Sequence, residues 1–424
     1  MDNFRIKNKT YCCDDLPLAH LAQSVGTPSY IYSESTLRQN CQQIISAFES
    51  YPTLACFAVK ALSNLSVLHT IFAEGLGADL VSGGELRRAL LAGVRSDRIV
   101  FSGVGKQADE IRQALHAGIL MFNVESPFEL ELIAALAREA GRQAAISFRV
   151  NPNIDAQTNE KIATGLYSTK FGLPEGELAP LLDQVRRDPH LELAGLACHI
   201  GSQIIDLQPM REAVSRMVQL VASVQGAGHK LRYLNMGGGL GIRYRDEEPP
   251  SLKEYGRTLI DAVRPTGLHL IIEPGRALVG NIGILLTRVV GVKKTPERHF
   301  IVLDAAMNDL LRPTLYGSYH EIEPVTPHQS GAPSVTCDFV GPICETGDFL
   351  GKGRTLPLPK VGDLYLIRGC GAYASSMAFQ YNSRPRAPEI LVKGDQFQVI
   401  RARENPEELW AGELSGLAAR SPAK

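Results

Sequence analysis

The sequence predicts a (β/α)8 barrel of the TIM type followed by an all-β domain. Short apolar runs and stretches of helical periodicity alternate eight times over residues 31–281, which is the size and rhythm of such a barrel. Beyond residue 281 this alternation gives way to β-rich runs separated by Gly and Pro turns. We expect a barrel over 31–281, a β-domain over 282–424, and an N-terminal segment, residues 1–30, that packs on the β-domain. A doubly wound open sheet is the alternative to the barrel.

Each expected barrel strand is a run of apolar residues bounded by polar or Gly-containing turns. The eight runs are Leu54–Val59, Ala78–Val81, Ile99–Phe101, Met121–Val124, Ala145–Val150, Leu193–Cys198, Tyr233–Met236 and Leu268–Glu273. Amphipathic stretches between them predict covering helices. The clearest of these are Glu85–Ala92, Ala108–Ala117, Pro127–Glu139 and Met210–Ala227.

Runs with strand character continue after the barrel, while helical periodicity becomes scarce. The runs are Ile284–Val292, Phe300–Leu303, Val335–Val340, Leu364–Arg368 and Phe397–Arg401. This change of pattern predicts a separate all-β domain.

Composition narrows the class of partner. The chain has a net charge of -1, a pI near 6.8 and no long run of like charges, so it offers no basic surface for nucleic acid or an anionic membrane. No apolar run approaches the ~20 residues of a membrane span, and the first residues lack the apolar core of a signal peptide. The eight cysteines form no CxxC pair and no metal-like spacing. These features favour a cytoplasmic enzyme with reduced thiols, no metal and a small-molecule substrate.

Reactive residues gather where the expected strands end. Active sites of (β/α)8 barrels are built at the carboxyl ends of their strands. A strand-end histidine or a glycine turn is often only structural, but several such ends at one rim indicate an active site. Five of the eight strands are followed by such residues: Lys60, Arg149 with Asn151, His199 with Ser202, Gly237–Gly241, and Glu273–Arg276.

Lys60 follows an apolar strand, so the location of its charge needs an explanation. A lysine at a strand end often extends to solvent with its ammonium group. If it is desolvated instead, its pKa falls, and the neutral amine becomes a nucleophile that attacks carbonyl carbons.

The glycine triplet Gly237–Gly239 predicts a phosphate-binding turn, because barrels often place bare backbone N–H groups near a helix N-terminus after this strand. Arg276 and the Ser202 hydroxyl could add hydrogen bonds to the same phosphate. The run Gly-Gly-Gly-Leu-Gly differs from the GxGxxG of dinucleotide sites, so a nicotinamide cofactor is disfavoured. Together with Lys60 and Glu273, the turn indicates pyridoxal 5'-phosphate (PLP).

These residues match the parts that a PLP site needs. Lys60 would form a Schiff base with the aldehyde, and Glu273 would keep the pyridine nitrogen protonated, so that the ring can draw electrons from a bond at the substrate Cα. His199 could lie against the ring face, and Asp79 could orient the Schiff base.

Sequence motifs extend this interpretation over nearly the whole chain, and they are specific in their combination and order. The barrel carries Phe57–Ala61, Asp79–Glu85, Phe101–Lys106, Thr169–Gly172, His199–Gln203, Gly237–Gly241 and Glu273–Arg276. The second domain carries Asn308–Tyr316, Val340–Asp348, Gly371–Tyr373 and Tyr381–Pro385. With these motifs the chain closely resembles the diaminopimelate decarboxylase family, PLP enzymes of the alanine-racemase-like fold (fold type III).

The resemblance implies a role for each matching residue. Lys60 would carry the cofactor, with His199 against its ring and Glu273 at its pyridine nitrogen. Guanidinium forks bind carboxylates in bidentate fashion, which suits a diacid substrate. The residues implied around the phosphate are Ser202, Gly238, Gly239, Gly275, Arg276 and Tyr373. Those implied for the substrate carboxylates are Arg276, Arg312, Tyr316 and Tyr373.

The resemblance also implies a homodimer and a reaction. Cys344 and Glu345 would extend into the active site of the neighbouring subunit, where Glu345 meets the distal ammonium of the substrate. The reaction would convert meso-2,6-diaminopimelate to L-lysine and CO2, the last step of lysine biosynthesis, with Cys344 returning a proton to the carbon. One departure from the family pattern is Leu62, where relatives often have asparagine. It could alter hydrogen bonding beside Lys60.

Three alternatives remain open. Decarboxylases of ornithine, lysine or arginine on this fold usually carry an aspartate after the reactive cysteine, whereas this chain has Glu345 together with Arg312 and Tyr316. A racemase of this fold is expected to use a tyrosine from its second domain as a base, and Cys344 has no role there. A non-catalytic regulatory protein should have lost Lys60 or Cys344, and both are present.

Overall fold

The computed structural model describes residues 3–327 and 331–418. The chain divides into two compact units. The barrel unit is Leu37–Val279, and the sheet unit combines Met1–Thr36 with Gly280–Lys424. Each unit is described separately.

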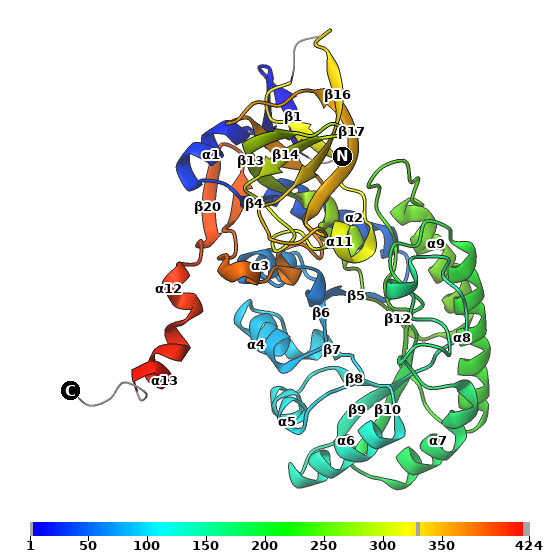
Figure 1. Ribbon diagram of the computed structural model, residues 1–424. Coiled ribbons are helices and arrows are strands. Elements are labelled where there is room, and N and C mark those ends of the chain that lie inside the picture. The colour runs from blue at the N-terminus through cyan, green and yellow to red at the C-terminus, as the bar shows by residue number, and fades with distance from the viewer. Residues whose placement is uncertain (1–2, 328–330, 419–424) are drawn as a thin grey trace. The chain divides into compact units, whose positions relative to one another are not determined.

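Eight parallel strands of the barrel unit close into a barrel and follow one another around it in chain order (Figure 1). The ring closes where β12 pairs with β5, with Leu270 opposite Thr53. This closure confirms the predicted barrel and excludes the open sheet. The strands are β5 (Thr53–Ala58), β6 (Gly77–Leu80), β7 (Ile99–Phe101), β8 (Met121–Val124), β9 (Ala144–Arg149), β10 (Leu191–Ala197), β11 (Tyr233–Asn235) and β12 (His269–Ile272).

Helices cover the outside of this ring (Figure 1). In α6 the Ser126 side chain accepts the Glu129 backbone N–H, and Pro127 occupies the first turn, where its missing N–H costs nothing. Its buried face includes Leu130 and Ile133. The helices are α2 (Glu34–Phe48), most of which belongs to this unit, α3 (Leu65–Ala73), α4 (Gly83–Leu91), α5 (Ala108–Ala117), α6 (Pro127–Glu139), α7 (Leu178–Arg187), α8 (Gln208–Gly226), α9 (Leu252–Val263) and the short α10 (Arg276–Val279).

The barrel is filled rather than hollow. Cys56, Val100, Met121, Ala194 and Ile271 form one buried cluster although they come from five different strands. Side chains from strands that do not pair can meet only in the barrel interior, so this cluster is its apolar core. Polar residues collect at the carboxyl ends of the strands instead.

The sheet unit is built on a nine-stranded sheet, in which β4 lies between β13 and β19. The expected boundary between residues 30 and 31 therefore runs through β4. A separate three-stranded sheet precedes β4 in the chain. The strands of the nine-stranded sheet are β4 (Ser29–Ser33), β13 (Gly283–Lys294), β14 (His299–Leu303), β15 (Ile322–Pro324), β16 (Ser334–Val340), β17 (Phe349–Pro357), β18 (Leu364–Ile367), β19 (Glu389–Lys393) and β20 (Gln396–Arg401).

The first residues of the chain pack against this sheet. Phe4 and Leu21 share a buried cluster with Ile31, Ile284 and Leu366. The remaining elements of the sheet unit are β1 (Phe4–Lys7), β2 (Thr10–Cys13), β3 (Leu16–Pro17), α1 (Leu18–Val25), α11 (Arg312–Tyr316), α12 (Pro406–Leu409) and α13 (Leu414–Ala418).

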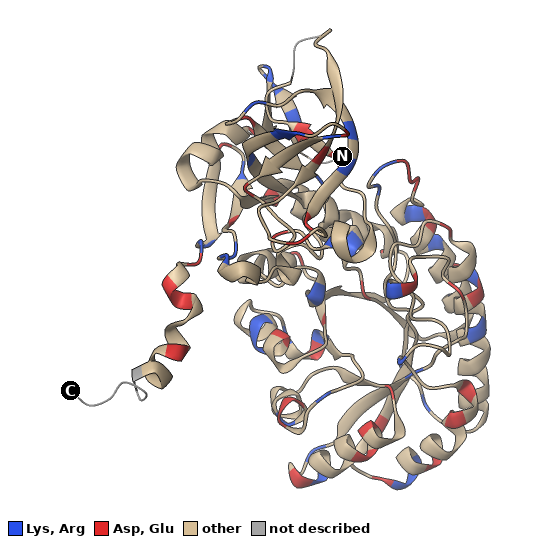
Figure 2. Ribbon diagram, in the orientation of Figure 1, with Lys and Arg blue, Asp and Glu red and all other residues tan. Residues whose placement is uncertain are grey.

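Charges of both signs are interspersed along the outer helices α8 and α9 (Figure 2). Such a mixed surface gives no extended field of one sign. Among the residues that the structure describes, no helix has the length and apolar character needed to cross a membrane.

Candidate active site

Lys60 lies just beyond its strand. β5 ends at Ala58, and Val59–Ala61 form a single 3-10 turn that carries the lysine. Its Nζ lies 2.6 Å from Asp79 Oδ2 on the neighbouring strand β6, and its side chain is 37% exposed. The amine is therefore not desolvated as considered above. It forms an ion pair in which a carboxylate compensates its charge, and it stays accessible.

Leu62, the departure from the family pattern, closes the turn that carries Lys60. Its backbone N–H donates to the Val59 carbonyl at 3.1 Å, and its side chain is buried. A buried leucine at this position anchors the turn by packing, in a way that a polar side chain would not.

Asp79 is wholly buried and only half satisfied. Oδ2 binds Lys60, whereas Oδ1 is buried without a hydrogen-bond partner among the described residues. A buried carboxylate oxygen that lacks a donor costs free energy, so such atoms tend to mark a position where another group binds.

Glu273 follows β12 and is held by two asparagine amides. Its Oε1 accepts from Asn235 Nδ2 at 2.6 Å and from Asn123 Nδ2 at 3.4 Å. Both amides are oriented by their own partners, since Asn235 Oδ1 accepts the Gly237 N–H and Asn123 Oδ1 accepts the Ser147 hydroxyl. No described residue donates to Glu273 Oε2, so this oxygen can receive a further donor.

Burial and the nearby negative charge of Asp79 raise the pKa of Glu273 to about 7. Burial disfavours the ionised form because the carboxylate loses its hydration. A cation placed beside Glu273 would reverse the shift and keep the group ionised.

His199 follows β10 and is held as a neutral ring. The Gly238 backbone N–H donates to His199 Nδ1 at 3.3 Å, so Nδ1 is unprotonated. Burial first, and then the positive charges of Arg149 and Lys60, lower the pKa of His199 well below its usual value. The ring is thus an uncharged flat surface at neutral pH.

The glycine triplet after β11 lies too close to other backbone for side chains. A Cβ on Gly238 would meet the Glu273 carbonyl oxygen at 2.1 Å, and Gly237 and Gly239 have φ values of +65° and +115°. The loops after β10, β11 and β12 therefore meet backbone to backbone. The expected helix N-terminus is absent from this turn, because the next helix, α9, begins only at Leu252.

Arg276 begins α10, directly after Gly275, and its guanidinium is buried between two hydroxyls. Nε and Nη2 lie 3.4 and 3.1 Å from Ser202 Oγ, and Nη1 donates to the Tyr244 hydroxyl at 2.7 Å. Hydroxyl partners orient a guanidinium without cancelling its charge. A guanidinium held in this way is suited to bind an anion such as a phosphate or a carboxylate.

Arg149 and Asn151, two further residues of the predicted rim, have structural partners. Arg149 Nη1 lies 3.0 Å from each oxygen of Glu125, and its guanidinium lies over the Phe171 ring. Asn151 Nδ2 donates to the Leu166 and Phe171 carbonyls. Both residues therefore fasten the loop after β9.

The remaining predicted residues lie in the sheet unit. Arg312 and Tyr316 share the one-turn helix α11, with the guanidinium carbon 5.8 Å from the centre of the Tyr316 ring. Cys344 and Glu345 are exposed in the loop between β16 and β17. Tyr373 has a φ of +55°, an uncommon conformation for a tyrosine.

The turn Tyr381–Ser383 fixes the loop that carries the exposed cysteine. Asn382 Oδ1 accepts the Cys344 backbone N–H at 2.9 Å, and a hydrogen bond to Glu345 raises the pKa of Tyr381. Asn382 and Ser383 both have positive φ, which is uncommon away from glycine. The backbone of the cysteine loop is thus tied to a second segment of the chain.

Sequence reasoning missed several of these contacts. Asn123 and Asn235 are polar residues inside apolar strands, and this contrast could have pointed to a role in the barrel interior. No comparable signal marks Tyr244, because its partner Arg276 is distant in sequence and lies on another loop. Asn382 lies in the motif Tyr381–Pro385, but the motif did not indicate its contact with Cys344.

Comparison with known proteins places the chain in a family. A profile described as "Pyridoxal-dependent decarboxylase, pyridoxal binding domain" matches residues 34–280. A diaminopimelate decarboxylase from Neisseria meningitidis serogroup A is 47% identical over 96% of this chain and 100% of the relative. One from Zymomonas mobilis is 44% identical over 97% and 98%. The chain belongs to the diaminopimelate decarboxylase family.

Solved structures of diaminopimelate decarboxylases agree with this assignment. The Helicobacter pylori diaminopimelate decarboxylase complexed with L-lysine superposes with a TM-score of 0.91 at 43% identity, covering 94% of this chain and 100% of that one. The M. jannaschii diaminopimelate decarboxylase, also with L-lysine, gives a TM-score of 0.91 at 35% identity, covering 97% and 98%. The predicted family, fold type and PLP dependence are confirmed.

The barrel residues of this diaminopimelate decarboxylase family member fit the cofactor. PLP presents an aldehyde, a pyridine nitrogen and a phosphate. Each feature has a complementary group in the barrel: the accessible Lys60 amine with its Asp79 partner suits the aldehyde, and Glu273 Oε2 suits the pyridine nitrogen. The charge of Arg276 suits the phosphate.

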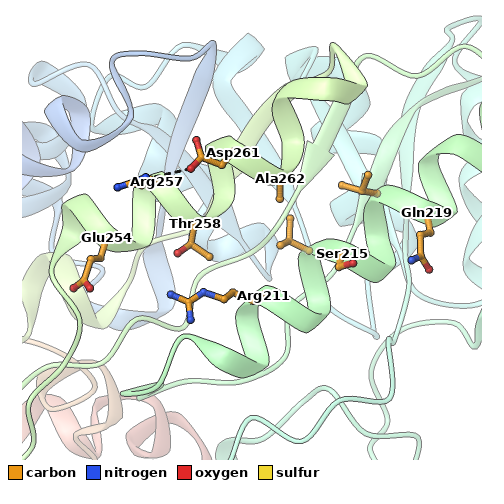
Figure 3. A pocket seen from close by; sticks show the side chains of 10 residues that line it. Arg211, Ser215, Gln219, Glu254, Arg257, Thr258, Asp261 and Ala262 are labelled. Carbon is orange, nitrogen blue, oxygen red and sulfur yellow. Dashed lines mark hydrogen bonds and ion pairs between the residues drawn. The ribbon is translucent and has the colours of Figure 1, made fainter.

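A groove of about 730 Å3 lies elsewhere, between α8 and α9 (Figure 3). Arg211 and Ser215 face it from α8, and Glu254, Arg257 and Asp261 face it from α9. Its charges are of both signs, and Arg257 pairs with Asp261 at 3.4 Å. None of the predicted site residues lines this groove, so the reaction is not assigned to it.

Proposed function

We propose that the chain converts meso-2,6-diaminopimelate to L-lysine and CO2 with PLP, in the last step of lysine biosynthesis. The observation that carries the proposal is the accessible Lys60 amine, which buried Asp79 holds in place. It occurs in a chain that is 47% identical to a diaminopimelate decarboxylase. L-lysine, the expected product, is the molecule complexed in two of the similar structures.

In this proposal PLP is held by residues at the carboxyl ends of the barrel strands, and the family resemblance adds Tyr373. When bound, PLP supplies an electron sink for the pair left by the departing carboxylate. Asp79 fixes the position of Lys60 Nζ, and Glu273 would hold the ring nitrogen of the cofactor. The residues assigned to PLP are Lys60, Asp79, His199, Ser202, Gly238, Gly239, Glu273, Gly275, Arg276 and Tyr373.

His199 contributes a flat, neutral imidazole. Its Nδ1 accepts the Gly238 N–H, so the ring cannot rotate without losing that bond. An uncharged ring packs against the cofactor face without adding a second positive charge to the site. Glu273 therefore remains the group that sets the protonation of the ring nitrogen.

Substrate recognition is assigned to two kinds of charge. Arg276, Arg312, Tyr316 and Tyr373 would bind the carboxylates, since a guanidinium fork matches a carboxylate geometrically. Glu345 would bind the distal ammonium. This pattern selects a substrate with a carboxylate and an amine at each end, and it disfavours ornithine, lysine and arginine, which lack the second carboxylate.

Cys344 is assigned the final proton transfer. A thiol is acidic enough to protonate the strongly basic carbon that decarboxylation leaves behind. The exposed loop that carries Cys344 and Glu345 suits residues that complete the site of a neighbouring subunit. We therefore propose a cytoplasmic homodimer with shared active sites.

The test is a comparison of substrates. PLP-loaded protein is offered meso-diaminopimelate, lysine, ornithine and arginine in turn, and CO2 release is measured for each. We expect release from meso-diaminopimelate alone. Faster release from one of the other three would assign the chain to another basic amino acid, and no release from any of them would support a non-catalytic role.

A further inference from the structure

We propose that His320 is a positioning residue for Arg312. It holds one edge of the Arg312 guanidinium so that the opposite edge is directed at a substrate carboxylate. The inference rests on the proposed function in one respect, which is the assignment of Arg312 to that carboxylate. It adds His320, which lies in none of the sequence motifs, to the site.

His320 is buried and fixed before it contacts the arginine. It lies between α11 and β15 with no exposed surface. Arg354 Nη2 donates to the His320 carbonyl at 2.7 Å, which anchors its backbone. The ring nitrogen Nδ1 lies 2.8 Å from the Arg368 carbonyl at the end of β18, which anchors its side chain. The ring therefore has little freedom of its own.

The partners of His320 determine its tautomer. A carbonyl oxygen only accepts, so Nδ1 must carry a proton to bind the Arg368 carbonyl. A guanidinium nitrogen only donates, so Nε2 must be the acceptor for Arg312 Nε, which lies 3.3 Å away. The ring is thus neutral. A second proton on Nε2 would face the N–H of Arg312, and two positive charges would then meet in a buried position.

Two hydrogen bonds hold one edge of the Arg312 guanidinium. Nε donates to His320, and Nη2 lies 3.3 Å from Ser318 Oγ. The guanidinium is planar and rigid, so holding this edge sets the direction of the opposite edge, which is formed by Nη1 and the second Nη2 hydrogen. Neither the imidazole nor the hydroxyl cancels the positive charge.

Such an arrangement reduces the cost of binding. A free arginine side chain has many rotamers, and ordering it when the ligand arrives subtracts from affinity. Arg312 is only 5% exposed, and its guanidinium also lies near the Tyr316 ring. With His320 in place the fork is ordered before the carboxylate arrives, so the benefit should appear in substrate binding more than in the chemical step.

The test compares two substitutions of His320 in the PLP-loaded enzyme. His320→Leu removes the acceptor, and His320→Gln keeps one donor and one acceptor on a planar group. We expect His320→Leu to raise KM for diaminopimelate about tenfold with kcat within about threefold, and His320→Gln to restore most of the affinity. Competitive inhibition by pimelate, a diacid of the same length without amines, should weaken in parallel.

Tyr11→Phe is the matched control. It removes another hydrogen bond of the sheet unit, from the Tyr11 hydroxyl to Glu323 at 2.6 Å, and should leave KM unchanged. The visible absorbance of bound PLP should be unaffected in all three variants. A purely structural role for His320 would be indicated by an equal fall of activity in Tyr11→Phe, or by a lower kcat with unchanged KM, and either result would overturn the proposal.

Arg312→Met separates this proposal from the one on which it rests. If Arg312→Met leaves KM unchanged, the assignment of Arg312 to a carboxylate fails. If Arg312→Met raises KM but His320→Leu does not, only the positioning role fails. The double variant should be no worse than Arg312→Met alone, because His320 acts through the arginine, and additive losses would contradict that. Should His320→Leu not fold, Ser318→Ala carries the test, and an unchanged KM in it would overturn the proposal.

Discussion

Lys60 Nζ lies 2.6 Å from Asp79 Oδ2, and the second oxygen of Asp79 is buried without a hydrogen-bond partner. The lysine is therefore both the accessible amine of the site and the cation that makes the burial of Asp79 tolerable. These two roles can be separated by substitution, because only one of them requires a nucleophile.

Lys60→Ala should abolish both the visible absorbance of bound PLP and activity, and it should lower the melting temperature of the protein. Lys60→Arg should also abolish absorbance and activity, since a guanidinium does not deprotonate in proteins. It keeps a cation beside Asp79, however, so its melting temperature should stay closer to that of the wild type. Absorbance spectra and thermal unfolding check both variants, and a Lys60→Ala protein that retained colour and turnover would refute the assignment.

Glu273 predicts a pH dependence of stability in the protein stripped of PLP. Its pKa is about 7 in the folded state against 4.5 ordinarily, so between these values the folded state binds a proton that the unfolded state has lost. Stability from this group is complete below about pH 4.5 and is lost as the pH rises through 7. Urea unfolding across this range should therefore show a fall that Glu273→Gln reduces.

Asp309 is the control for this titration, because burial also raises its pKa to about 7, in the sheet unit. Added PLP should remove the contribution of Glu273 to the pH dependence of stability, because its carboxylate would then have a cationic partner. The contribution of Asp309, which is measured with Asp309→Asn, should remain. The same slope in the wild type and Glu273→Gln would show that the carboxyl does not titrate there.

The sequence predicts those parts of the site that depend on residues close together in the chain, and it misses those that depend on contacts between distant residues. The strand that carries Asp79 and the strand that precedes Glu273 were predicted because sequence patterns of this kind are local. The barrel then brings the ends of these strands to one rim. Other contacts of the site depend on loop conformations. They are the ion pair of Lys60, the contact of Arg276 with Tyr244 and the contact of Arg312 with His320. Loop conformation is set by tertiary packing, so no local pattern reveals those partners.

Arg149→Met should destabilise the protein by about 3 to 5 kcal/mol, because it leaves the Glu125 carboxylate buried without its cation. The Glu125 side chain has no exposed surface and that of Arg149 is 10% exposed. Arg112→Met is the matched control, since the ion pair of Arg112 with Glu139 is exposed and should matter little. Chemical unfolding measures both variants, and equal losses would show that burial does not set the strength of the first pair.

Cys344→Ala should keep PLP binding and visible absorbance but lose its proton donor. We expect turnover to fall by about 10²- to 10⁴-fold, the usual contribution of a positioned acid. Asn382→Ala, which removes only the acceptor of the Cys344 N–H, should cause a smaller loss because the thiol remains. Lysine formation and CO2 release are measured together. Wild-type turnover in Cys344→Ala would remove the role assigned to the thiol.

Shared active sites predict that two inactive variants restore activity when mixed. A hybrid dimer of Lys60→Ala and Cys344→Ala chains contains one site that carries both substitutions and one that carries neither, if the cysteine of each chain serves the site of its partner. Random reassembly gives about half hybrids, each with one intact site, so about a quarter of wild-type activity should return. If each cysteine serves its own chain, every site carries one substitution and mixing restores nothing. Reassembly of Lys60→Ala with Lys60→Arg is the control, since both variants lack the amine and no arrangement of their chains creates an intact site.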